Sequence, residues 1–137
     1  MKTPDLMHTI RHRVYFCDTD AGSVVYFGNM GKYIEMGFTE WFRHYAESLQ
    51  AMNKRHRIFF VVKESHQHFR KSLHYDEEIQ ITTALKNMKF YTMTFTTTVT
   101  VNEEVRFIGE TTLTPIDPVS SLPVKLPQEI MQLKVIR

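Results

Sequence analysis

One long amphipathic segment constrains the fold of this chain more than any other feature. From Met30 to Leu49 the apolar side chains recur at i, i+3 and i+4, which predicts a helix of about five turns. Asn29 precedes this segment and is a favoured N-cap residue, since its side chain can accept hydrogen bonds from the free amides of a first helical turn. The apolar stripe is rich in aromatic residues, so we expect this helix to supply the main part of the core. The stripe consists of Met30, Tyr33, Ile34, Gly37, Phe38, Trp41, Phe42, Tyr45 and Leu49.

Short segments with strand character flank this helix in the sequence. Alternation of apolar and polar residues, or an abundance of Thr, Val and aromatic residues, favours extended structure in them. They lie at residues 8–16, 58–69, 78–86, 90–101 and 105–114. We expect burial at the start of the second segment, at residues 60–62, and a short last helix at 128–135. One long helix against an antiparallel sheet that runs largely as a meander predicts the α+β class.

Composition bounds the function. The 137 residues fit a single domain, 1–137. Lysine plus arginine number 17 and aspartate plus glutamate number 15, and this near balance gives no support to nucleic-acid binding. No apolar run approaches the roughly 18 residues of a membrane span, and the first residues lack the apolar core of a signal peptide. We therefore expect no membrane insertion. The only cysteine, Cys17, cannot form an internal disulfide, so we expect a reduced, cytoplasmic setting.

The segment from Asp18 to Asn29 holds the densest group of reactive side chains. Asp18 and Asp20 lie in a turn just ahead of the predicted helix, whose first amides are free to donate hydrogen bonds. Such amides can stabilise an oxyanion, and a nearby carboxylate can attack a carbonyl carbon or activate water. Together these groups suffice for acyl transfer. Asp-x-Asp is also common as plain turn chemistry, so the pattern alone leaves both interpretations open.

The same segment resembles the 4-hydroxybenzoyl-CoA thioesterase family of the hotdog superfamily, and in particular its YbgC-like acyl-CoA thioesterases. Asp18–Ala21 fits the start of the family motif, and Val24–Tyr26 fits its middle. Further matching residues are Glu35, Glu40 and Arg43 on the helix, residues 61–63, Asp76, Ile79 and the proline-marked segment 122–129. The resemblance extends from about Val14 to Ile130, nearly the whole chain.

This resemblance implies a hotdog fold, in which an antiparallel sheet of five or six strands wraps around one long central helix. It also implies a homodimer or homotetramer, whose paired subunits join their sheets and share the active sites. The matching catalytic carboxylate is Asp20, as nucleophile or general base toward a thioester carbonyl. The backbone N–H of Phe27 matches the amide that polarises this carbonyl, and Glu35 is a second candidate carboxylate. Asp18 is expected to be structural. The reaction is expected to require no cofactor, neither a metal nor a redox group.

Three residues depart from the family pattern. Phe27 stands where many YbgC-like members have histidine, Ser23 replaces a glycine, and Ser72 replaces a proline. Loss of the imidazole affects efficiency or substrate choice, and Ser23 restricts the backbone of the turn. None of these changes removes the Asp20 carboxylate or the Phe27 amide.

Residues for substrate binding are expected on both sides of the motif. The candidates for an apolar acyl or aryl pocket are Tyr26, Phe59 and Phe60. Arg70 and Lys71 lie at the end of a basic stretch and are candidates to bind the phosphates of coenzyme A. The alternative is that this stretch is only a basic surface exposed to solvent. His66 and His68 share a strand face, but no third ligand is obvious in the sequence, so no metal site is expected.

The sequence therefore predicts a cytoplasmic thioesterase that hydrolyses an acyl- or aroyl-CoA thioester to the free acid and CoA. One alternative is an acyl-carrier-protein thioesterase that releases a biosynthetic product, with the basic stretch meeting an acidic carrier. Another is a non-catalytic hotdog protein that binds acyl-CoA or a protein partner. The intact Asp20 favours an enzyme, whereas the departures at Ser23 and Phe27 are the support for the non-catalytic protein.

Overall fold

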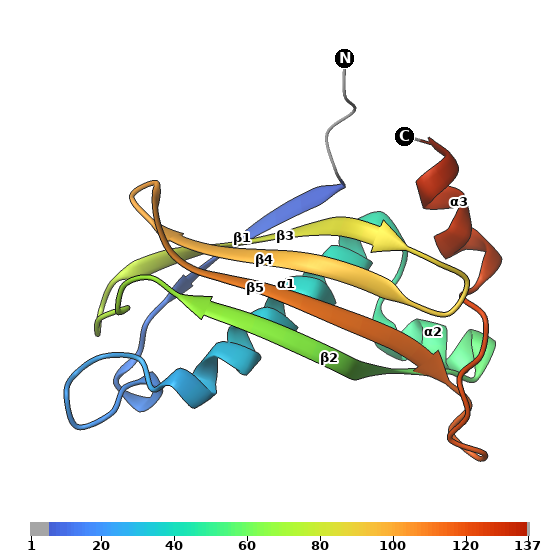
Figure 1. Ribbon diagram of the computed structural model, residues 1–137, viewed down its shortest axis with the longest axis horizontal. Coiled ribbons are helices and arrows are strands. Elements are labelled where there is room, and N and C mark those ends of the chain that lie inside the picture. The colour runs from blue at the N-terminus through green and yellow to red at the C-terminus, as the bar shows by residue number, and fades with distance from the viewer. Residues whose placement is uncertain (1–5, 137) are drawn as a thin grey trace.

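Five antiparallel strands form one sheet in the computed structural model, which describes residues 6–136. In chain order they are β1 (Met7–Arg13), β2 (Phe59–Phe69), β3 (Glu78–Met88), β4 (Met93–Val101) and β5 (Glu104–Ile116). In space the order is β1-β3-β4-β5-β2 (Figure 1). Strands β3, β4 and β5 run as a meander, whereas β2 pairs with β5 at one edge of the sheet. The predicted α+β class and antiparallel sheet are confirmed.

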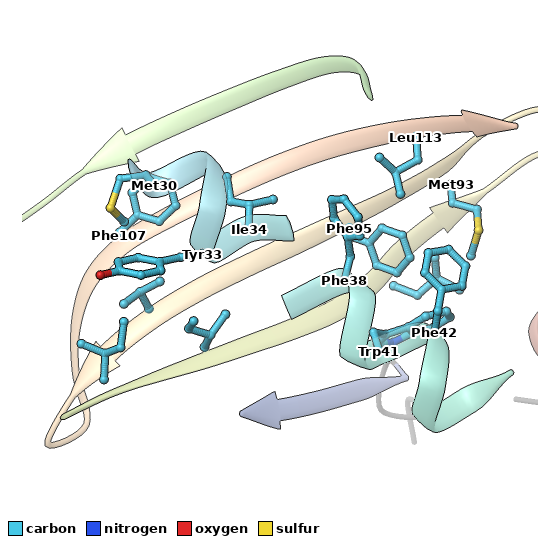
Figure 2. Packing of buried hydrophobic residues seen from close by; sticks show 14 of the residues in the cluster. Met30, Tyr33, Ile34, Phe38, Trp41, Phe42, Met93, Phe95, Phe107 and Leu113 are labelled. Atoms are coloured by element: carbon cyan, nitrogen blue, oxygen red, sulfur yellow. The ribbon is translucent and has the colours of Figure 1, made fainter. Parts of the chain in front are cut away.

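Helix α1 (Met30–Tyr45) packs on one face of this sheet and buries most of the predicted apolar stripe. Figure 2 shows Trp41 close to Phe95 of β4, and their ring centroids lie 4.8 Å apart. Gly37 allows the helix backbone to approach the sheet closely, because a Cβ added there would lie 2.3 Å from the hydroxyl oxygen of Thr83. A long helix against a single antiparallel sheet is the predicted hotdog arrangement.

The long helix ends earlier than the sequence predicts. α1 ends at Tyr45, and a separate helix, α2 (Leu49–His56), begins after Ser48, whose hydroxyl accepts a hydrogen bond from a first-turn amide at 3.1 Å. Leu49 therefore belongs to α2, and the prediction of one five-turn helix is wrong at its end. The predicted last helix is confirmed as α3 (Gln128–Ile136). None of the helices in the described part of the chain is long and apolar enough to cross a membrane.

Strand β2 lies at an edge of the sheet and is exposed along nearly its whole length (Figure 1). Helix α1 packs mainly on β1, β3 and β4, so Val61 and Val62 are 37% and 56% exposed. Burial is expected for residues 60–62, and in the single chain this expectation is wrong. Even Phe60 is only half-buried. Within residues 6–136, the outer edge of β2 has no strand partner. Long exposed edge strands of this kind are surfaces for pairing with another chain.

Candidate active site

The loop between β1 and α1 places the two carboxylates of the Asp-x-Asp motif in opposite environments. A short turn, η2 (Phe27–Asn29), continues directly into α1. The Asp18 side chain is 2% exposed, whereas Asp20 is exposed. The Asp20 N–H donates to the carbonyl oxygen of Val24 at 2.8 Å, and the Asp20 carboxylate accepts from the Gly22 N–H at 2.8 Å. These bonds close a tight loop around Asp20.

Asp18 is the centre of a buried polar network. Its carboxylate accepts hydrogen bonds from the Tyr15 N–H at 3.1 Å, the Tyr33 hydroxyl at 3.0 Å and Lys32 Nζ at 2.5 Å. His12 Nε2 lies 3.4 Å from the same carboxylate. Burial by itself raises the pKa of Asp18, but the hydrogen bonds outweigh burial and lower the pKa to about 2. Asp18 is therefore ionised at neutral pH and joins β1, the loop and α1, which agrees with the structural role expected of it.

Four of the predicted catalytic and substrate-binding residues line one cleft of about 380 Å³: Asp20, Phe27, Arg70 and Lys71. The rest of its lining is Val24, Val25, Met30, Phe69, Ser72, Leu73 and Phe107. Met30 and Phe107 lie side by side at this end of the sheet (Figure 2). Phe27 is the first residue of η2, and the first amides of a helix have no partner within it. Within residues 6–136, the Phe27 N–H donates no hydrogen bond. A carboxylate, a residue with a free amide and two cations therefore line a mainly apolar space.

Arg106 of β5 holds the segment that carries Arg70 and Lys71, the two cations of this cleft. No pattern in the sequence marks Arg106 as a candidate site residue. Its carbonyl oxygen accepts hydrogen bonds from the N–H groups of Arg70 and Lys71 at 2.9 and 3.1 Å. Its guanidinium donates to the Ser72 carbonyl at 2.6 Å and to both carboxylate oxygens of Glu77, at 3.2 and 3.1 Å. Ser72 and Glu77, which accept these three guanidinium bonds, are remote from Arg106 in sequence, so only the folded sheet brings them together.

The remaining candidates for substrate binding and catalysis lie outside this cleft. The Tyr26 ring packs against Phe27, with ring centroids 5.0 Å apart, but does not line the cleft. Phe59 is exposed at the start of β2, and Phe60 packs against the aromatic stripe of α1, whereas the cleft lies at the other end of that strand. Glu35 lines a second groove, of about 500 Å³, between α1 and β2. The structure therefore does not bring these four residues to the Asp20 cleft.

Groups that resemble metal ligands lie elsewhere. His66 and His68 are exposed on β2. Three side chains between α2 and α3 hold potential ligand atoms within 4.8 Å of one another: Glu47, His56 and Glu129. Arg55 forms ion pairs with both of these carboxylates, so the group is a polar cluster that joins the two helices.

Comparison with known sequences shows the family of this chain. The profile of the thioesterase-like superfamily matches residues 14–133. The acyl-CoA thioester hydrolase YbgC of Escherichia coli is 32% identical over 121 residues, which cover 87% of this chain and 89% of the relative. The predicted relationship to YbgC-like thioester hydrolases is confirmed by these matches.

Solved structures agree on the fold. A DHNA-CoA thioesterase from Staphylococcus aureus superposes with a TM-score of 0.88 at 17% identity, covering 95% of this chain and 92% of that one. A variant of 4-hydroxybenzoyl-CoA thioesterase in complex with 4-hydroxybenzoyl-CoA gives a TM-score of 0.86 at 13% identity, covering 93% and 98%. The predicted hotdog fold is therefore confirmed. Together with the match over residues 14–133, the fold shows that this chain belongs to the thioesterase-like superfamily.

Proposed function

We propose that this chain hydrolyses acyl-CoA thioesters in the cleft lined by Asp20, Phe27, Arg70 and Lys71. The observation that carries the proposal is the composition of this cleft, which combines a carboxylate, a free amide and two cations around an apolar space. Such groups supply a nucleophile or base, a donor for an oxyanion and an anchor for phosphates. The Escherichia coli relative at 32% identity is named an acyl-CoA thioester hydrolase, which supports the same substrate class.

In the proposed reaction, Asp20 acts on the thioester carbonyl while the Phe27 N–H donates a hydrogen bond to the carbonyl oxygen. As a nucleophile, the carboxylate forms an acyl anhydride as the C–S bond breaks, and water then releases the acid. As a general base, it takes a proton from a water molecule that attacks the same carbon, and the C–S bond then breaks. Either route expels CoA as a thiolate, and a thiol pKa of about 8.5 makes strong acid assistance unnecessary. The reaction therefore does not require the histidine that Phe27 replaces.

The lining of the cleft favours acyl or aroyl groups without polar substituents. Apart from Asp20, Ser72 and the two cations, its side chains are apolar, as in most pockets for small organic ligands. The cations differ in their partners. Lys71 forms an ion pair with Glu104 at 2.6 Å, whereas the Arg70 guanidinium has no acidic partner within residues 6–136. Arg70 is therefore the better anchor for a CoA phosphate.

The open edge of β2 supports a homodimer as the functional unit. β2 offers 11 residues for pairing with a second copy, and it ends next to Arg70 at the cleft. Pairing there would join two sheets and place the two clefts close to the subunit interface, and a homotetramer would need a further contact surface. We also place the protein in the cytoplasm, where its single cysteine would stay reduced.

Thiol release from a panel of short-chain, long-chain and aromatic acyl-CoAs tests the proposed function. We expect the wild-type chain to release CoA from at least one ester, and the apolar lining predicts a preference for unsubstituted acyl groups. The same acyl groups on an acyl carrier protein, measured in parallel, distinguish a carrier-protein thioesterase by a higher kcat/KM. Absence of hydrolysis with both classes would contradict the proposal and favour a non-catalytic binding protein.

A further inference from the structure

Asn29 occupies the N-cap position of α1 but does not cap the helix. Its backbone has φ −81° and ψ −7°, in the helical region, and its side chain accepts no hydrogen bond from the first turn. The expected capping role is therefore wrong. Instead, the Asn29 side-chain amide donates a hydrogen bond to the backbone carbonyl oxygen of Asp18 at 2.8 Å. This bond spans the whole loop that holds Asp20 and Phe27.

The Asp18 carbonyl oxygen anchors the turn around Phe27 from both sides. It accepts a second hydrogen bond, from the Tyr26 N–H at 3.0 Å. The Asn29 N–H in turn donates to the Tyr26 carbonyl oxygen at 2.8 Å. Residues on both sides of Phe27 are thus tied to one oxygen atom and to each other, which restricts the rotation of the peptide that carries the Phe27 N–H.

The Asp18 carbonyl oxygen is itself fixed by the contacts of the Asp18 side chain. The Asp18 side chain is buried and is bonded by Tyr15, Lys32, Tyr33 and His12, so its backbone carbonyl has little freedom to move. Oxyanion donors act most strongly when they are fixed before the reaction, because no reorganisation is then needed as the charge develops. Misplacement by about 1 Å can cost on the order of 100-fold in rate.

We propose that Asn29 is a positioning residue, whose side-chain bond to the Asp18 carbonyl keeps the Phe27 N–H aligned with the substrate carbonyl. This inference rests on the proposed function, since it gives the Phe27 amide the task of holding the oxyanion. The oxyanion exists only along the reaction path, so misalignment weakens the transition state more than the bound substrate. Loss of the Asn29 bond therefore lowers kcat and changes KM little.

Asn29→Ala tests this inference, with Asn53→Ala as its matched control. The Asn53 side-chain amide also donates to a backbone carbonyl, that of Ile58 at 3.0 Å, but Asn53 lies within α2 and does not line the cleft. With the best acyl-CoA of the panel, Asn29→Ala should lower kcat about 10-fold or more and change KM less than about 2-fold. Asn53→Ala should keep the wild-type kcat although it removes the same kind of bond.

Asn29→Asp is the second variant, in case alanine unfolds the loop. It preserves the shape of the side chain but replaces the donor with an ionised acceptor, so the bond to the Asp18 carbonyl is lost and kcat should again fall at least about 10-fold. Wild-type kcat in a folded Asn29→Ala or Asn29→Asp protein, next to an inactive Asp20→Asn, would overturn the inference and leave the proposed function standing. A wild-type chain that hydrolyses no thioester would overturn both.

Discussion

Asp18 and Asp20 are separated by a single residue and have different roles. In an extended strand, alternate residues share a face and two such carboxylates would be equally exposed. Here a short 3-10 turn that ends at Asp18 breaks the alternation, so Asp18 points to Lys32 and Tyr33 while Asp20 lines the cleft. The spacing of the motif is therefore insufficient to separate a structural from a reactive carboxylate, and their burial separates them.

The network around Asp18 predicts a loss of stability in acid. Its pKa is about 2 in the folded chain, against roughly 3.9 in the unfolded chain. The ionised form therefore stabilises the fold above pH 4, by about 2 kcal/mol, and this contribution is lost as the pH falls from about 4 toward 2. Free energies of unfolding in urea should fall more steeply below pH 4 for the wild type than for Asp18→Asn, which has no carboxyl group to protonate. Parallel pH profiles for the two proteins would contradict this role of Asp18.

Local motif residues could be predicted from the sequence, whereas their supports could not. Asp20 and Phe27 belong to one continuous segment with a recognisable pattern, and the structure finds both at the cleft. Asn29 donates instead to the backbone carbonyl oxygen of Asp18, and Arg106 donates to that of Ser72 in addition to its ion pair with the remote Glu77. Every residue has a carbonyl oxygen, so no residue type marks such a partner in the sequence.

At the scale of elements, periodicity located α1 but misplaced its end. Leu49 continues the apolar stripe and packs on the core, so the pattern runs on across the break at Ala46–Ser48. The Ser48 side chain, which caps α2, is the local signal of that break. The expected burial at the start of β2, at residues 60–62, is wrong because a strand pattern does not tell an edge strand from a central one.

Two glycines of α1 should respond to alanine in opposite ways. A Cβ at Gly37 would meet Thr83 Oγ1 at 2.3 Å and Ile81 at 3.0 Å, whereas a Cβ at Gly31 meets nothing within 4 Å. Gly37→Ala should therefore destabilise the fold by about 1–3 kcal/mol through overpacking. Gly31→Ala should stabilise it by about 0.5–1 kcal/mol, because alanine has the higher helix propensity. Thermal and urea unfolding of the two variants measure this, and equal effects would argue against close packing of α1 on the sheet.

At the scale of the whole molecule, the order of the strands creates the cleft. Local patterns predicted strands but did not show that β2 would pair with β5 rather than with β3. That pairing places Arg70 and Lys71 next to the Arg106 carbonyl oxygen. In this position they line the same cleft as Asp20. The site therefore depends on long-range pairing, which no short segment of the sequence encodes.

The exposed edge of β2 predicts a homodimer. Analytical ultracentrifugation of the wild type should give twice the chain mass of 16.2 kDa. Val62→Lys places a like charge from each subunit at the proposed interface and should dissociate the dimer without unfolding it. Val119→Lys, at a loop position that is 93% exposed, is the matched control and should remain dimeric. A wild-type protein of single-chain mass, or a dimer unaffected by Val62→Lys, would exclude β2 as the interface.

The most direct test of the account is the kcat of Asp20→Asn on the preferred acyl-CoA, compared with Asp76→Asn and Glu35→Gln. Asp76 is an exposed carboxylate outside the cleft, at a positive φ of 73° that asparagine tolerates. We predict that Asp20→Asn loses about 100-fold or more in kcat with its circular dichroism unchanged, and that Asp76→Asn keeps wild-type activity. An active Asp20→Asn enzyme, or a loss confined to Glu35→Gln, would contradict the assignment of the reaction to the Asp20 cleft.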